Sequence, residues 1–156
     1  MTTSDALRET LSDLVQVNSR FVQAIRRLAR ENGSGDSLAT WRTLGVLQRS
    51  GALRLGVLAD ASQVAQPTMT KLVAGLVERG WVERLPDADD ARAWQIAISA
   101  DGAAALAEWR AGLASVLLPY FADLDAGDLA AVRRTVTLLD AHMASLEPVS
   151  NQEVAL

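Results

Sequence analysis

Residues 66–78 limit the possible folds more than any other segment, because they predict a short helix with clearly marked ends. Pro67 stands in the first turn, where its missing amide hydrogen costs nothing, and Gly80 follows the last turn. The apolar residues of this segment lie at helical spacing and predict its buried face: Met69, Leu72, Val73 and Leu76. A turn at 63–65 separates the segment from a shorter apolar stretch at 57–61. The two stretches together predict a helix-turn-helix.

A hairpin follows this helix directly. Residues 81–85 and 93–98 alternate between apolar and polar, on either side of a turn rich in Pro and Asp at 86–91. The short segment 53–55 also alternates and predicts an edge strand. A helix-turn-helix followed by a two-stranded hairpin predicts a mainly α (α+β) fold, the winged helix-turn-helix.

Longer helices are predicted on both sides of this core. From residue 5 to residue 30, with Ser4 as the N-cap, apolar residues recur at alternating steps of four and three. Asn18 interrupts this stripe, either to set the register against a partner helix or to line a pocket. A second helix is predicted at 37–50. After the hairpin, helices begin at the caps Ser99 and Asp125, and Pro119 interrupts the chain between them.

These stripes are longer than one small domain can bury, which predicts contact with a second copy of the chain, although some of each face closes the chain's own core. The predicted parts are an N-terminal dimerisation helix at 1–36, the winged helix-turn-helix at 37–98, C-terminal dimerisation helices at 99–147 and a flexible tail at 148–156.

The composition excludes several classes of function. The chain has no cysteine and one histidine, His142, so thiol chemistry and a zinc site are not expected. No nucleophile–base pair or phosphate-binding glycine loop is present, which argues against an enzyme, and no cofactor is predicted. The chain has no apolar run of about 20 residues and no signal-peptide pattern, so we expect a soluble, cytoplasmic protein away from membranes.

The order of motifs resembles the MarR family of transcription regulators. The matching stretches are Leu58-Ala59, Val64 to Leu72, Gly80 to Asp87, the Asp-x-Arg element Asp90-Ala91-Arg92, and Ile98 to Gly102, with Leu44 and Leu47 in the second helix. The resemblance covers nearly the whole chain. It implies a homodimer that binds an inverted-repeat operator in double-stranded DNA. It also implies that the dimer usually acts as a repressor.

Three residues depart from the family pattern. Ala65 replaces a usual capping Ser, so the cap of the following helix is expected to be weaker. Ala91 replaces a common second wing Arg, which removes one expected phosphate contact per wing. Gly56 replaces a usual Ser or Thr.

The residues predicted to contact DNA lie on the helix 66–78 and on the hairpin. A helix in the major groove presents its outward side chains to base edges. These predicted residues are Gln66, Thr68, Thr70 and Lys71 on the helix, Arg84, Asp90 and Arg92 on the hairpin, and Arg54 before the helix-turn-helix. Without the flanking pattern, the helix positions would be ordinary solvated residues.

Arg92 is the sharpest of these predictions. An arginine at a hairpin tip can enter a narrow minor groove, and Asp90 can pair with its guanidinium and orient it. The alternative is a surface salt bridge with little energetic effect. Arg84 could contact phosphate or neutralise Asp87 or Asp89. The three aspartates of this loop lack the spacing of an EF-hand, so no metal is predicted.

The resemblance also implies release from DNA by a small aromatic or anionic ligand. The predicted lining residues are Asn18, Phe21, Trp41, Arg42 and Trp109. Trp41 is better explained as a core residue and Trp109 as part of the dimer interface. The main alternative function is a winged-helix module for protein partners, which the net charge of −4 supports. The acidic excess lies in residues 93–156, so DNA binding must depend on a few placed cations.

Overall fold

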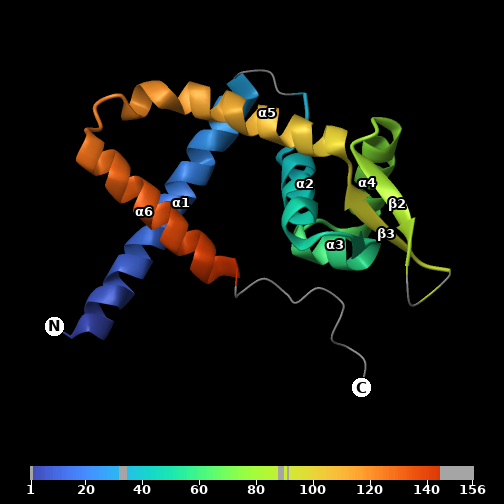
Figure 1. The fold of residues 1–156 in the computed structure, drawn as a ribbon, viewed down its shortest axis with the longest axis horizontal. Coiled ribbons are helices and arrows are strands. Elements are labelled where there is room, and N and C mark those ends of the chain that lie inside the picture. Colours follow the sequence, from blue (N-terminus) through green and yellow to red (C-terminus); the bar gives the residue numbers. More distant parts are fainter. Residues whose placement is uncertain (1, 32–34, 88–89, 91, 145–156) are drawn as a thin grey trace. The chain divides into compact units, whose positions relative to one another are not determined.

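The computed structural model describes residues 2–31, 35–87, 90 and 92–144, and the predicted tail at 148–156 lies outside them. Its elements (Figure 1) are α1 (Thr3–Glu31), α2 (Leu38–Ser50), β1 (Leu53–Arg54), α3 (Leu55–Ala61), α4 (Gln66–Glu78), β2 (Val82–Pro86), β3 (Trp94–Ile98), α5 (Ala100–Leu117), the 3₁₀ helix η1 (Leu118–Phe121) and α6 (Ala126–Met143). The predicted fold class, mainly helical with a small antiparallel sheet, is confirmed.

The chain divides into two compact units, residues 1–38 and residues 39–156. The first unit is mostly α1, which begins two residues earlier than predicted. Thr2 acts as its cap instead of Ser4, because the Asp5 amide donates to the Thr2 hydroxyl and the Thr2 amide and hydroxyl donate to the Asp5 carboxylate. These bonds from Thr2 hold the pKa of Asp5 below its ordinary value. The ionised Asp5 carboxylate interacts favourably with the positive end of the helix dipole, at the N-terminus of α1.

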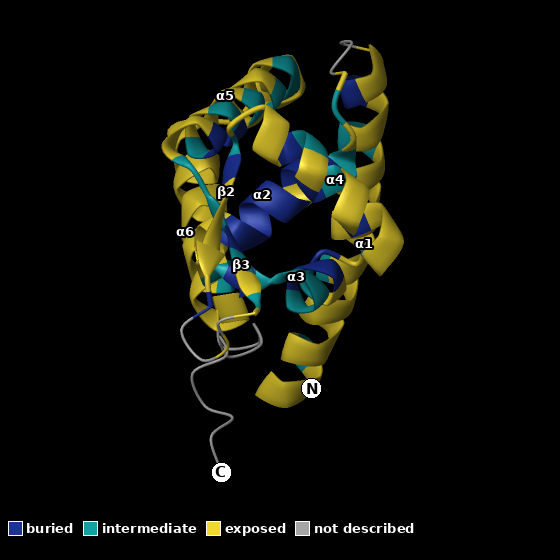
Figure 2. Ribbon diagram, turned by 90° about the vertical axis from the view of Figure 1, so that its right-hand side faces the viewer, coloured by how far each residue is buried: buried dark blue, intermediate teal, exposed yellow. Residues whose placement is uncertain are grey.

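The core of the second unit is formed by one face each of α2, α3 and α4, closed by the sheet and by the first turns of α5. Figure 2 shows α2 buried along most of its length. The side chains below 2 % exposure include Leu44 and Leu47 of α2, Leu58 of α3, Met69 of α4 and Leu106 of α5. The inward face predicted for α4 is confirmed, since Met69, Val73 and Leu76 are buried.

The three strands form one antiparallel sheet in the order β1-β3-β2. β1 pairs Leu53 with Ile96 and Arg54 with Gln95, which confirms the predicted short edge strand. β2 and β3 pair from Val82 with Ile98 out to Pro86 with Trp94. Because β2 is also an edge strand, Pro86 at its end removes no hydrogen bond from the interior of the sheet.

Ser99 joins the sheet to α5. Its hydroxyl accepts from the Gly102 amide, as predicted for an N-cap, and donates to the Gly80 carbonyl at 2.6 Å. The Ser99 amide also donates to the Trp81 carbonyl. The first turn of α5 therefore lies directly on the turn that ends α4.

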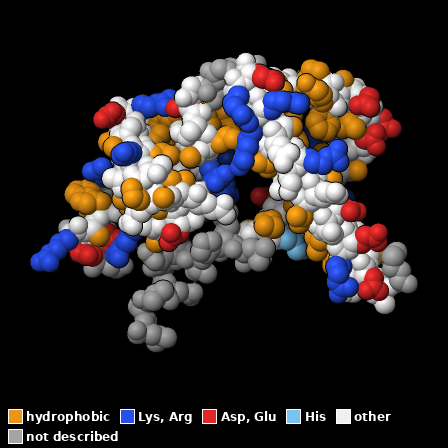
Figure 3. Space-filling view, turned by 180° about the vertical axis from the view of Figure 1, so that it is seen from behind, with side chains coloured by type: hydrophobic (Ala, Val, Ile, Leu, Met, Phe, Trp, Pro, Cys, Tyr) orange, Lys and Arg blue, Asp and Glu red, His pale blue; other side chains and the backbone are white. Residues whose placement is uncertain are grey.

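The C-terminal part of the chain exposes much apolar surface. Pro119 stands in the first turn of η1, where α5 ends, and Asp125 caps α6 through a reciprocal capping box with Asp128. No residue of α6 is buried. Figure 3 shows hydrophobic side chains gathered over the end of α5 and η1, at the upper right. None of the described helices combines the length and the apolar character that a membrane span requires.

Candidate nucleic-acid interface

The outward face of α4 carries the side chains predicted to meet DNA. Gln66, Thr68, Thr70 and Lys71 are all exposed. Lys71 lies opposite the buried Met69 and Val73, Thr68 and Thr70 lie on the flanks of the helix, and Gln66 is its first residue. Ala65 gives the helix no side-chain cap, which confirms the weaker cap expected from the sequence. The Thr70 hydroxyl donates to the Gln66 carbonyl at 3.0 Å, so its hydrogen bond to a DNA acceptor would replace an existing one. Contact with DNA by these residues stays a prediction.

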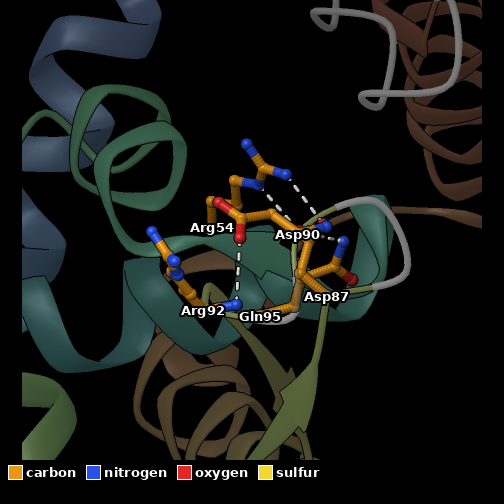
Figure 4. A network of polar contacts seen from close by, with 5 residues as sticks. All are labelled: Arg54, Asp87, Asp90, Arg92 and Gln95. Carbon is orange, nitrogen blue, oxygen red and sulfur yellow. Dashed lines mark hydrogen bonds and ion pairs between the residues drawn. The ribbon is translucent and has the colours of Figure 1, made fainter.

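An ion pair anchors the base of the wing, the hairpin formed by β2 and β3. Two nitrogens of the Arg54 guanidinium, Nε and Nη2, each lie 2.7 Å from one carboxylate oxygen of Asp87. The Asp87 side chain is only 1 % exposed, and the Gln95 amide and the Asp90 backbone amide donate to it as well (Figure 4). Bidentate pairs of this kind are geometrically specific. Arg54 thus links β1 to the wing, a role that was not predicted from the sequence.

Asp90 contacts Arg92 differently from the prediction. Its carboxylate accepts a hydrogen bond at 2.9 Å from the backbone amide of Arg92, and not, among the described residues, from the guanidinium. The Ala93 amide donates in turn to the Asp90 carbonyl. Asp90 therefore shapes the tip of the wing through the backbone. Figure 4 shows the Arg92 side chain pointing away from Asp87.

Three exposed cations on the α4 and wing side have no acidic partner among the described residues: Lys71, Arg84 and Arg92. Asp87, one of the two partners considered for Arg84, is paired with Arg54 instead. The other, Asp89, lies outside the described residues, as does Ala91. Lys and Arg side chains project at the wing end of the molecule, on the left of Figure 3. This side of the chain therefore presents cations that no described acid neutralises, although the whole chain is acidic.

The residues predicted to line a ligand pocket divide between the two units. Trp41 is 7 % exposed and stacks on Trp109, with ring centroids 5.1 Å apart. Trp109 therefore packs against the core of the second unit, whereas the sequence placed it at the dimer interface. Arg42 donates to the Ser62 carbonyl at the end of α3. Asn18 and Phe21 are exposed on α1, and the pocket stays a prediction.

Two features of this interface were not predicted from the sequence. Asp87 and Gln95 were not identified as parts of a buried network, because Arg54 lies 33 positions away in the chain. Trp94, at the start of β3, was not singled out, yet it is 55 % exposed. A tryptophan two residues after Arg92 in the hairpin was the available signal. Within the described part of the chain, no group of acidic or histidine side chains could hold a metal.

The chain is similar in sequence to bacterial transcription regulators. The model of the MarR family matches residues 34–93. An uncharacterized HTH-type transcriptional regulator of Mycobacterium bovis is 34% identical over 85 residues, which cover 51% of this chain and 59% of that protein. One from Mycobacterium leprae is 35% identical over the same share of each. The chain thus matches a little over half the length of these curated relatives.

Solved structures share the fold over most of the chain. A MarR family protein from Bacillus stearothermophilus superposes with a TM-score of 0.65 at 18% identity, over 92% of this chain and 99% of that one. The apo form of MarR from E. coli superposes with a TM-score of 0.63 at 22% identity, over 81% of this chain and 95% of that one. The resemblance predicted from the sequence is therefore confirmed: residues 34–93 match the model of the MarR family, and the chain shares the fold of solved MarR structures.

Proposed function

We propose that this chain is a homodimeric transcription regulator that binds double-stranded DNA sequence-specifically, acting in the cytoplasm as a repressor. α4 would enter the major groove and the wing the adjacent minor groove. The observation that carries the proposal is the placement of charge. Lys71, Arg84 and Arg92 have no acidic partners in the described part of the chain, while Asp87, the acid buried beside them, is neutralised by Arg54.

The chemistry of α4 fits the reading of bases. Gln66 can pair bidentately with adenine, and Lys71 can reach guanine or phosphate. Thr68 offers both a hydroxyl and a methyl group, and the methyl group suits the methyl of thymine. Such contacts give specificity, whereas the wing and phosphate contacts position the protein.

The exposed apolar surface supports a dimer. In the single chain, Leu7, Leu11 and Phe21 of α1, Tyr120 and Phe121 of η1, and Leu129, Val132, Val136 and Met143 of α6 are each more than 40 % exposed. Apolar stripes of this length are typical of surfaces that a partner covers. A two-fold dimer would place its recognition helices on half-sites about one helical turn apart.

Replacing Val136 by glutamate is expected to convert the dimer into monomers, because it buries a charge in the proposed interface. The measurement is sedimentation velocity at micromolar concentration. Ala141→Glu is the control, since Ala141 lies on the opposite side of α6 and is also exposed. An unchanged dimer in Val136→Glu would exclude α6 from the interface.

Replacing Arg92 by alanine is expected to weaken operator binding by about 1–3 kcal/mol per wing, because a cation leaves the minor groove. A protected-fragment screen on genomic DNA first supplies the operator, and affinity is then measured against salt concentration. The control is Arg110→Ala, which removes the same charge from α5. Arg110 donates a hydrogen bond to Gln48 and is not among the predicted DNA contacts.

Wild-type binding should fall steeply as salt rises, since each phosphate contact releases counterions. If the wild-type dimer binds no genomic fragment at low salt, the DNA-binding proposal is wrong. A winged-helix module for protein partners then becomes the better explanation.

The family resemblance supports release by a small aromatic or anionic effector. The same screen, repeated with phenolic compounds, tests this part of the proposal. Loss of the protected fragments with one compound identifies an inducer. Arg42→Ala and Phe21→Ala then test the predicted lining residues.

A further inference from the structure

A groove of about 290 Å³ lies between α4 and the wing. Its lining residues come from four elements: Leu55 of α3, Thr70 and Val73 of α4, Arg84 of β2, and Trp94 and Ile96 of β3. Thr70 and Arg84 are already predicted DNA contacts. Leu55 and Trp94 are not.

The strand register explains why Trp94 lines this groove. Arg84 pairs with Ile96, and Pro86 pairs with Trp94, so these four side chains share one face of the hairpin. Ile96 is 3 % exposed within the core, whereas Trp94, two residues nearer the tip, is 55 % exposed. The buried face of the sheet therefore continues outward as an exposed apolar surface beside the recognition helix.

Trp94 differs from the other three tryptophans of the chain. Trp109 stacks on the buried Trp41, and Trp81 packs against Trp41 at a tilt, while Trp94 makes no ring contact within the described residues. Arg84, beside it, is exposed and has no ion pair there. A cation and a bare aromatic ring thus lie together in one groove. Their chemistry suits a ligand that alternates anionic and apolar groups.

We propose that this groove holds the phosphodiester strand that separates the major groove from the minor groove of bound DNA. The inference rests on the proposed function. A helix in one groove and a hairpin in the next must lie on either side of that strand, which therefore crosses the space between α4 and the wing. Arg84 contacts a phosphate of the strand, and Trp94 and Leu55 pack against its deoxyribose.

The first test separates the charged contact from the apolar one. Arg84→Gln is expected to reduce the slope of log K against log salt by about 0.9 for each phosphate that the arginine neutralises. Trp94→Ala is expected to lower affinity at least about fivefold with no change in that slope, because it removes only packing. Trp94→Phe should retain most of the affinity. Leu85→Ala, on the opposite face of the wing, is the matched control.

The second test locates the phosphate. Operator duplexes carry one neutral methylphosphonate at successive backbone positions. One position per half-site is expected to weaken wild-type binding and to leave Arg84→Gln unaffected. DNA should also protect Trp94 from acrylamide quenching, measured as the difference between wild type and Trp94→Phe.

The outcomes distinguish this inference from the proposed function. If wild type binds no DNA, the function itself fails. If wild type binds, Arg92→Ala weakens binding, and Trp94→Ala binds as wild type with Trp94 still fully quenched in the complex, the strand does not occupy the groove and the inference is overturned.

Discussion

Replacing Gly102 by alanine should lower the free energy of unfolding by about 3 kcal/mol, the upper end of the range for overpacked sites. A Cβ atom at this position would overlap the Trp81 carbonyl oxygen and lie 3.1 Å from a side-chain carbon of Ile98. The start of α5 cannot move away from Trp81 without breaking hydrogen bonds. Ser99 ties the start of α5 to Gly80 and Trp81 through two hydrogen bonds, of 2.6 and 3.0 Å.

Gly112→Ala is the matched control for this prediction. Gly112 lies on the same helix and has no atom within 4 Å of an added Cβ. Alanine is about 1 kcal/mol better than glycine in a helix interior, so this variant should be as stable as wild type or more so. Urea unfolding followed by circular dichroism measures both. Equal stability of the two variants would show that α5 does not rest on the Trp81 backbone.

Replacing Arg54 by alanine should lower the free energy of unfolding by about 2 kcal/mol, less than the roughly 3–5 kcal/mol seen when fully buried pairs are broken. The expected loss of unfolding free energy is smaller here because the Arg54 side chain is 40% exposed and its charge is partly solvated. The variant removes the guanidinium partner of the Asp87 carboxylate, which is 1% exposed, and leaves Gln95 and the Asp90 backbone amide as neutral donors to it. Asp87→Asn should lower the free energy of unfolding by less than Arg54→Ala does, because the Arg54 guanidinium that remains can be hydrated by water.

The double variant Arg54→Met, Asp87→Leu separates stability from wing orientation. It removes both charges together, so its stability should exceed that of Arg54→Ala. Its operator affinity should still fall, because the bidentate restraint at the base of the wing is gone. Urea unfolding and operator binding measure the two effects. A double variant that is the least stable of the three would contradict the ion-pair account.

The parts of the fold that depend on local signals could be predicted from the sequence. α4 spans Gln66–Glu78, as predicted, because Pro67, Gly80 and the apolar spacing all mark the same boundaries. The caps at Ser99 and Asp125 were predictable for the same reason. The start of α1 was not, since Thr2 and Ser4 are both good caps. The choice between them depends on the reciprocal bond that Thr2 makes with Asp5.

The interactions that depend on distant residues could not be predicted. Asp87 has several possible cationic partners in the sequence, and only the pairing of β1 with β3 brings Arg54 to it. The stacking of Trp109 on Trp41 likewise depends on how α5 crosses α2. The exposed face of α4 followed from periodicity, whereas the groove beside Trp94 depends on the strand register.

The attachment of α5 to the winged helix has a mechanical consequence. The helix has 18 residues and is therefore about 27 Å long. Its first two turns are held by Ser99, Gly102 and the buried Leu106, while its far end continues into the exposed η1. Such a helix acts as a lever. A tilt of about 5° at one end moves the other by roughly 2 Å. In the proposed dimer, small shifts among the apolar helices would thus change the separation of the two recognition helices.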